Sequence, residues 1–478
     1  MHPEEFLKGR VKLYGADCLE VLAQLPENSI DSCVVDPPYH LTSIVKRFGS
    51  DGAAPAKSAA QRRFEKTGGA DRKPGTDQYG RLSRGFMGKV WDGGDIAFRP
   101  ETWAAVMRVL KPGGHLVAFG APKNSHRLTC AIEDAGFEIR DMIAWLFGSG
   151  FPKSHDVSKG IDRAAGAERE AISTGKAVKR MIPGADQNKA GWEKNNGREY
   201  VPGVTTPATP AAQEWEGWGT ALKPAIEPIT LARKPLSEKT VAANVLRWRT
   251  GALNIDACRI ESTDSQLAEK YASVQKAGPR ENSVYGNDSG DRAGAAPHRN
   301  GRWPANVAHD NSDQVIKAFP SEAGGNDNRV GIDPGKRPSG FGNVGNDSGG
   351  SVPNGTLYGD NGSASRFFYS AKADSEDRIG SKHPTVKPVD LVRWLVRMVT
   401  PPGGTVIDPF AGTGTLGEAA WLEGAYSILI EREPEYQSDI RRRMKLCLAG
   451  PEEKARESIK AKLSGKPQNH GPLFGGTE

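Results

Sequence analysis

The segment from Val406 to Glu431 constrains the fold of this chain more than any other part of its sequence. It reads VIDPFAGTGTLGEAAWLEGAYSILIE, in which an apolar strand enters a glycine-rich turn, a helix follows, and a second strand ends in an acid. The turn has the spacing Gly412-x-Gly414-x-x-Gly417. In a nucleotide-binding turn such glycines permit close approach of the backbone to the ligand, and the distant acid binds ribose hydroxyls. We therefore expect a nucleotide site on a parallel sheet.

The acid just ahead of these glycines narrows the choice of nucleotide. A dinucleotide would place its pyrophosphate near the helix N-terminus, where the carboxylate of Asp408 repels phosphate and attracts a cation. S-adenosylmethionine carries a sulfonium and an ammonium but no phosphate, so it suits this position better. A tight glycine turn that binds nothing is the alternative that this segment alone leaves open.

Strands and helices alternate at both ends of the chain, which is typical of a parallel α/β sheet. Apolar runs and helical spacing predict the individual elements. The expected strands are residues 11–14, 32–35, 115–119, 137–147, 405–407 and 426–431, and the expected helices are residues 17–25, 101–110, 125–135 and 389–399, with one more from the glycine turn to about 422. A Lys-Pro-Gly-Gly sequence at 111–114 predicts a turn between a helix and a strand.

The middle of the chain has a different texture. The 478 residues include 57 Gly and 33 Pro, and residues 151–365 consist of short polar runs and Pro-rich turns. We expect residues 1–150 and 366–448 to form the core, residues 151–365 to be a large, partly disordered insert, and residues 449–478 to be a polar tail. Within the insert, residues 216–260 and 302–310 look ordered and apolar enough to dock on the core.

A glycine-rich stretch at 46–89 has no sustained period and carries eleven basic residues against four acidic ones. It reads as a basic loop that contacts phosphates or as a solvated loop, and both readings stay open. The whole chain has 64 Lys and Arg against 58 Asp and Glu, a formal charge of +6 that permits a polyanionic partner without requiring one.

A second motif, Asp36-Pro37-Pro38-Tyr39, directly follows the predicted strand 32–35. Two prolines fix φ and remove two backbone donors, so the Asp36 carboxylate and the Pro37 carbonyl form a rigid pair of acceptors. This pair matches the two N–H donors of an exocyclic amino group. Accepting both hydrogens localises the nitrogen lone pair for attack on a methyl sulfonium, and Tyr39 offers a face for stacking a base. A plain turn with an exposed tyrosine is the alternative for the motif alone.

Together the two motifs resemble those of the amino-methylating DNA methyltransferases, which modify N6 of adenine or N4 of cytosine with S-adenosylmethionine. The family's catalytic tetrapeptide, (D/N/S)-P-P-(Y/F/W), is matched at 36–39, and its cofactor loop resembles DPFAGTGT at 408–415. A catalytic segment that precedes the glycine loop is the order of the circularly permuted β group. The resemblance covers roughly residues 10–150 and 366–448, and it implies a Rossmann-like sheet with a target-recognition region between its halves.

The resemblance also assigns roles to residues. Asp36, Pro37, Pro38 and Tyr39 match the catalytic motif, Glu431 matches the acid that holds the ribose, and Asp17 matches the acid near the adenine of the cofactor. The segment HPTVKP at 383–388 looks like the one that lines the methionine end. The cofactor-binding residues that the resemblance implies are Asp17, Thr385, Lys387, Asp408, Phe410, Gly412, Gly414, Thr415 and Glu431.

The expected function is site-specific methylation of an exocyclic amino group on a base flipped out of double-stranded DNA, with N6 of adenine favoured. N4 of cytosine is the nearest alternative, and a nicotinamide-dependent oxidoreductase that uses the glycine loop is a more remote one. The target sequence does not follow from the chain. A companion restriction endonuclease, a phage or mobile-element origin and a free-standing role would all leave the same residues, and the oligomeric state stays open.

Cysteine usage and hydropathy bear on the compartment. The five cysteines are scattered, with no C-x-x-C pair and no Cys/His cluster at zinc-ligand spacing, so we expect neither disulfides nor a metal site. The N-terminus lacks a signal sequence, and no window approaches a membrane span. These features predict a cytoplasmic protein of bacterial or phage origin that acts on DNA.

Overall fold

The computed structural model describes residues 2–39, 95–150, 154–173, 203–261, 301–321, 363–371 and 386–450, and the short runs 178–179, 184–188, 191–195, 199–200, 375–379, 381, 452–453 and 456. The chain folds into two compact units, residues 1–148 with 226–478 and residues 149–225. The predicted basic loop at 46–89 and most of the predicted tail lie outside the described residues.

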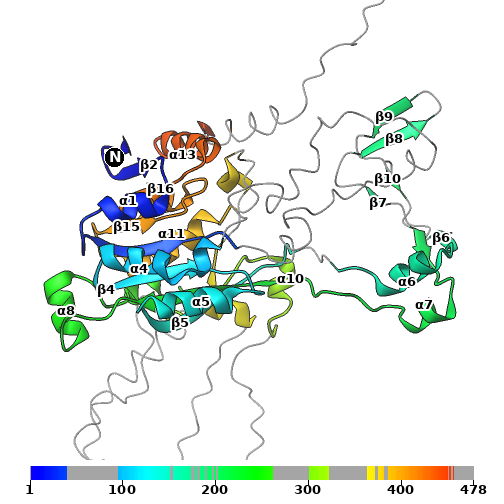
Figure 1. The fold of residues 1–478 in the computed structure, drawn as a ribbon, viewed down its shortest axis with the longest axis horizontal. Helices are drawn as coiled ribbons and strands as arrows, with labels where there is room; N and C mark the ends of the chain where they lie inside the picture. The colour runs from blue at the N-terminus through cyan, green and yellow to red at the C-terminus, as the bar shows by residue number, and fades with distance from the viewer. Residues whose placement is uncertain are drawn as a thin grey trace, which may run out of the picture. The chain divides into compact units, whose positions relative to one another are not determined.

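The first unit is built on a mixed sheet (Figure 1). Its described strands follow the order β1 (Glu4–Phe6), β2 (Val11–Tyr14), β16 (Tyr426–Ile430), β15 (Thr405–Asp408), β3 (Ile30–Val35), β4 (Leu110–Phe119), β12 (Ile226–Arg233), β5 (Glu138–Leu146), β13 (Val307–His309) and β14 (Tyr369–Ser370). Strands β2, β16, β15, β3 and β4 are parallel, whereas β12 runs antiparallel to both β4 and β5. The predicted α/β class is confirmed, with the first and last parts of the chain joined in one sheet.

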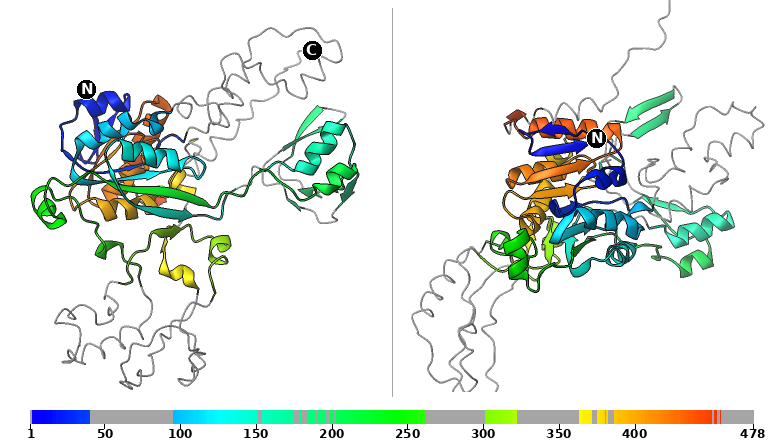
Figure 2. Two further views of the ribbon diagram at one scale, coloured as in Figure 1. Left: turned by 60° about the horizontal axis from the view of Figure 1, so that its bottom comes forward. Right: turned by 60° about the vertical axis from the view of Figure 1, so that its left-hand side comes forward.

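Helices cover both faces of this sheet (Figure 2, right). Helices α1 (Cys18–Gln24), α4 (Pro100–Val109) and α5 (Ser125–Asp134) pack on one face, and α11 (Val389–Val399), α12 (Thr415–Leu422) and α13 (Pro434–Leu446) pack on the other. Successive strand residues point to opposite faces. Ile407 and Ile428 therefore pack in the α1 core, whereas their chain neighbours Val406 and Leu429 pack in the α11 core.

Short elements complete the first unit. They are η3 (Ile96–Phe98), α8 (Val241–Trp248), η4 (Asp256–Cys258), α10 (Asp313–Ile316), η6 (Ala364–Phe367) and η7 (Ser375–Arg378). The start of α1 shows how the sequence fixes a boundary, because the side chain of Asp17 accepts a hydrogen bond from the Leu19 backbone N–H and caps the helix. Among the described residues, none of the helices is long and apolar enough to cross a membrane.

Two regions differ from what the sequence suggests. The turn predicted at 111–114 is wrong, because β4 runs through it with a shift in its register against β3. Gly113 has a φ of 80° there, and its N–H donates to the Lys234 carbonyl at 3.1 Å, so the residues form a bulge within the strand. The second difference is β12, which lies inside the range 151–365 and is a central strand of the main sheet.

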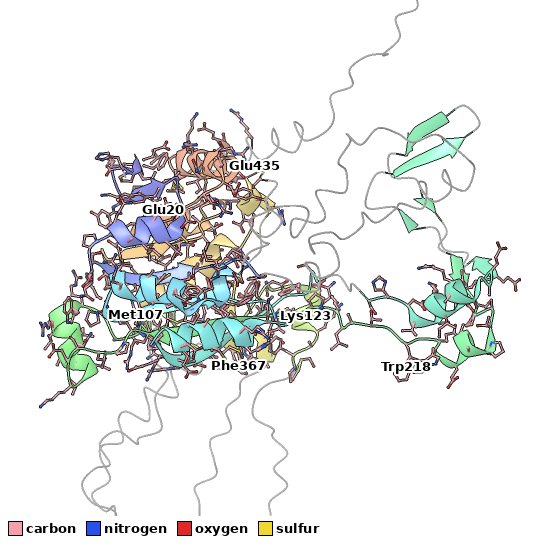
Figure 3. All side chains as sticks on the ribbon, viewed as in Figure 1. Glu20, Met107, Lys123, Trp218, Phe367 and Glu435 are labelled. Atoms are coloured by element: carbon pink, nitrogen blue, oxygen red, sulfur yellow. The ribbon has the colours of Figure 1, made fainter. Side chains whose placement is uncertain are left out.

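The second unit is described by itself. It contains α6 (Val157–Ala165), α7 (Pro210–Glu214) and the strand pairs β8 (Gly184–Asn188) with β9 (Gly191–Asn195), β7 (Val178–Lys179) with β10 (Glu199–Tyr200), and β6 (Ala171–Ser173) with β11 (Gly203–Thr205). The buried carboxylate of Asp162 in α6 links this helix to the start of α7. It accepts from Arg169 Nε at 2.5 Å and from the hydroxyl of Thr209, the residue before α7, at 2.7 Å. Trp218, labelled in Figure 3, is 60 % exposed and meets Trp215 edge to face.

Candidate active site

One edge of the sheet collects the acids that the sequence singles out. Because β2, β16, β15 and β3 are adjacent and parallel, their carboxyl ends meet at the same edge. Asp408 ends β15, Glu431 directly follows β16, Asp36 directly follows β3, and Asp17 lies three residues beyond the end of β2. The predicted cofactor acids and the predicted catalytic acid therefore belong to one row of strand ends.

The glycine turn follows β15 and leads into α12. Gly412 and Gly414 have φ values of 53° and 77°, in the left-handed region that side chains disfavour. The Gly412 N–H donates to Glu431 Oε2 at 2.8 Å, and the Glu433 N–H donates to Glu431 Oε1 at 2.8 Å. Glu431 is thus fixed against the turn by two backbone donors.

The far side of the turn is held by an arginine. Arg443 of α13 is 1 % exposed, and its Nε donates to the Thr413 carbonyl at 2.8 Å while its Nη1 pairs with Glu418 at 2.7 Å. The hydroxyls of Thr413 and Thr415 stand 3.5 Å apart in the same buried turn. Arg443 therefore fixes the same turn that binds Glu431 through the Gly412 N–H.

Two acids beside the turn, Asp408 and Glu431, are buried, and neither forms an ion pair with a lysine or arginine of the described residues. Burial raises the pKa of Asp408 to about 8, although it accepts from the Phe410 N–H at 2.9 Å; the nearby charges of Asp36 and Glu431 raise it further. Burial likewise raises the pKa of Glu431 to about 7, against the lowering effect of its backbone donors. This pair of acids favours a cationic ligand, because a positive charge would stabilise the ionised carboxylates.

The catalytic motif leaves β3 in a tightly packed conformation. Pro37 and Pro38 are buried, whereas Asp36 and Tyr39 are half-buried. The side-chain amide of Asn124 donates to the Tyr39 carbonyl, which ties the motif to the start of α5. The motif therefore presents two polar side chains from a fixed backbone.

Lys387 joins these two side chains. Its side chain is 9 % exposed, and its ammonium lies 2.7 Å from Asp36 Oδ2 and 3.0 Å from the Tyr39 hydroxyl. The Tyr39 hydroxyl donates to Asp36 Oδ1 at 2.8 Å. The assignment of Lys387 to the methionine end of a cofactor stays a prediction, and the structure places its ammonium against the catalytic motif.

Glu227 is the fourth member of this cluster, and no motif in the sequence points to it. It is the second residue of β12, where its Oε1 lies 3.2 Å from the Lys387 ammonium. The same oxygen is within hydrogen-bond distance of the Tyr39 hydroxyl, whose single proton is shared between Glu227 and Asp36. Burial opposes the charge of Lys387, but Asp36 and Glu227 outweigh it and raise the pKa of Lys387. Burial and the same two carboxylates raise the pKa of Tyr39, which therefore stays protonated.

The remaining predicted residues divide into three groups. Phe410 is half-buried in the turn, and Thr415 is buried at the first position of α12. Asp17 is half-buried and acts as the helix cap of α1. Thr385 lies outside the described residues.

A family model described as DNA methylase, of the N6/N4 methyltransferases, matches residues 30–442. This range runs from the first residue of β3 into α13 and includes both motifs. The chain belongs to the N6/N4 DNA methylase family. The match confirms the family resemblance seen in the sequence, and it favours methyl transfer over the nicotinamide alternative.

Individual relatives are more distant. The type II methyltransferase M.HindIII of Haemophilus influenzae is 23 % identical over 255 residues, which are 51 % of this chain and 64 % of that protein. The chain thus spans somewhat less than two thirds of that relative. Among solved structures, PvuII DNA methyltransferase (cytosine-N4-specific) has a TM-score of 0.37 at 13 % identity, covering 96 % of this chain and 95 % of that one. TTHA0409 of Thermus thermophilus, complexed with S-adenosyl-L-methionine, has a TM-score of 0.35 at 14 % identity, covering 92 % and 94 %.

Proposed function

We propose that this protein transfers a methyl group from S-adenosylmethionine to an exocyclic amino group of a base flipped out of double-stranded DNA, with N6 of adenine as the acceptor. The observation that carries the proposal is the pairing of β3 with β15, which sets the catalytic motif and the glycine turn on neighbouring strand ends. Membership of the N6/N4 family supports the reaction class.

The residues at the glycine turn fit the proposed cofactor. Asp408 and Glu431 are a pair of acids beside the turn that suits a sulfonium and opposes a pyrophosphate. Glu431 sits against the Gly412 N–H, where a carboxylate would accept the ribose hydroxyls. S-adenosylmethionine, when bound there, supplies an activated methyl group on its positive sulfur.

The chain's own residues would bind and orient the amine. The Asp36 carboxylate and the Pro37 carbonyl accept its two hydrogens, which localises the nitrogen lone pair. Each Asp36 oxygen already accepts one hydrogen bond in the structure and keeps a second lone pair for the amine. Tyr39 provides the aromatic face for the base. Catalysis then rests on orientation and electrostatics, without a covalent enzyme intermediate.

The test is methylation of unmethylated bacterial DNA by purified protein, followed by digestion to nucleosides and mass detection. We expect N6-methyladenine from the wild type and none from Asp36→Ala, with cofactor binding retained in the variant. Asp134→Ala, which removes an exposed acid at the end of α5, is the matched control and should keep full activity. N4-methylcytosine would keep the mechanism and change the base, and turnover by Asp36→Ala would refute the assigned role.

The proposal extends to the protein's setting. Residues 151–365 would read a specific DNA sequence, and the enzyme would act in the cytoplasm of a bacterium or a phage-infected cell, with or without a companion restriction endonuclease. Sequencing that maps methylated bases in a host expressing the protein tests this. A single short sequence motif at every modified site is the expected result.

A further inference from the structure

The cluster around the catalytic motif carries more negative than positive charge. Asp36 and Glu227 face one ammonium, that of Lys387, and the Tyr39 hydroxyl is neutral. Asp408 lies close enough to Asp36 for their charges to interact, but with its pKa at about 8 it is mostly protonated at pH 7. With both carboxylates counted as ionised, the described cluster has a formal net charge of −1.

Glu227 is the member of the cluster that lies outside the motifs identified in the sequence. It comes from β12, the antiparallel strand, whereas Asp36 and Tyr39 follow the parallel strand β3. Its side chain is 15 % exposed, and it contacts both Lys387 and the Tyr39 hydroxyl. Burial of a carboxylate costs free energy unless the charge is paired with a cation. Among the described residues, Lys387 is shared between Glu227 and Asp36.

The reaction proposed for this site would benefit from the extra negative charge of the cluster. A neutral amino group that attacks a methyl sulfonium forms a bond from nitrogen to carbon as the carbon–sulfur bond breaks. The nitrogen becomes positive until it loses a proton to the adjacent Asp36 carboxylate. A cluster with net charge −1 stabilises this developing positive charge, whereas a neutral Asp36–Lys387 pair stabilises it much less.

Building on the proposed function, we infer that Glu227 is a positioning residue that balances Lys387, so that Asp36 keeps its negative charge available to the target amine. Without Glu227 the ammonium would be neutralised by Asp36 alone. The amine would then meet a carboxylate whose charge is already compensated, in a site that has lost one of the two acceptors of the Tyr39 hydroxyl.

Glu227→Gln tests this inference, because it removes the charge and keeps the shape and an acceptor oxygen. We expect the single-turnover methylation rate to fall about tenfold or more, while the dissociation constant for S-adenosylmethionine changes less than about twofold. Glu227→Asp should recover part of the rate. Glu138→Gln is the matched control, since Glu138 pairs with Arg233 at the opposite end of the β5–β12 pair and should keep the wild-type rate.

A charge-restoring double variant separates electrostatics from a structural role. Glu227→Gln with Lys387→Gln returns the cluster to a net charge of −1, so it should methylate faster than Glu227→Gln alone. A structural role predicts the reverse, because two buried contacts would be lost instead of one. Thermal unfolding of each variant shows whether the fold is retained.

The inference and the proposed function fail in different ways. If the wild type methylates DNA and Glu227→Gln is equally fast, or if the double variant is no faster than the single one, the inference is wrong and the proposed function stands. If the wild type methylates no base of DNA, the proposed function is wrong and the inference falls with it. Nitrogen-15 NMR of Lys387 adds a readout that needs no activity, since Glu227→Gln should lower the pKa of this ammonium.

Discussion

Two pairs of acids at the same sheet edge show opposite ways of burying a carboxylate. Asp408 and Glu431 lie beside the glycine turn and interact with backbone N–H groups, and their pKa values are raised to about 8 and about 7. Asp36 and Glu227 share the ammonium of Lys387. The difference teaches that a backbone donor orients a buried carboxylate without neutralising it, whereas a cation lets the carboxylate stay ionised.

The largest loss of stability on substitution should come from removing the shared cation. Lys387→Met leaves two largely buried carboxylates without a counterion, and we expect a loss of roughly 3 kcal/mol in the free energy of unfolding near neutral pH. Urea unfolding at pH 7 measures the loss, and an unchanged free energy of unfolding would contradict this account.

A second effect, which depends on pH, should come from Asp408. Its pKa rises from an ordinary 3.8 to about 8 on folding, so between these values the folded protein binds more protons than the unfolded chain. Stability therefore falls as the pH rises through this window, by about 1.4 kcal/mol per pH unit for one such group. Asp408→Asn should make the stability curve flatter between pH 5 and pH 8, as followed by urea unfolding at several pH values.

The same ionisation should control ligand binding. A cationic ligand binds the ionised carboxylates, so the affinity for S-adenosylmethionine should rise between pH 6 and pH 8.5 and then level off. Calorimetric titration at each pH measures the affinity. In Asp408→Asn the rise should be smaller, and an unchanged pH profile would show that Asp408 does not face the ligand.

The smallest effect should come from Asp17, a further acid at this edge, which is half-buried. Asp17 caps α1 through its bond to the Leu19 N–H, so Asp17→Ala should cost about 1 kcal/mol of stability, whereas Asp17→Asn should cost little. Thermal unfolding of both variants separates the cap from the charge. If Asp17 also contacts the cofactor, both variants should bind S-adenosylmethionine more weakly than the wild type does.

Local sequence signals were sufficient to predict the parallel strands β2, β3, β4, β15 and β16 and the row of acids at their carboxyl ends. The helix predicted at 389–399 has the same bounds as α11, because its apolar spacing and the preceding proline are both local. Placing Asp36, Asp408 and Glu431 at one edge needed only the rule that parallel strands end together.

The cluster of Asp36, Tyr39, Lys387 and Glu227 could not be predicted in the same way. Glu227 lies on a strand whose neighbours, β4 and β5, precede it in the chain, and pairing over such distances leaves no local signal. Pro228 also argues against a central strand, because proline has no N–H to donate to the sheet, although its carbonyl still accepts from the Gly120 N–H at 2.9 Å. The position of Lys387 depends on that strand, so its contacts with Asp36 and Glu227 emerge only in the folded chain.

The strand that carries Glu227 begins where the second unit ends. Residues 149–225 leave the sheet after β5 and return at β12, and the flanking residues Leu146 and Ile226 are register partners in adjacent antiparallel strands. The chain therefore departs and returns at nearly the same point, as it would at a hairpin turn. Evolution can lengthen, shorten or exchange the intervening segment without shifting the register that fixes Glu227, so this part of the protein can diversify while the chemistry beside it is conserved.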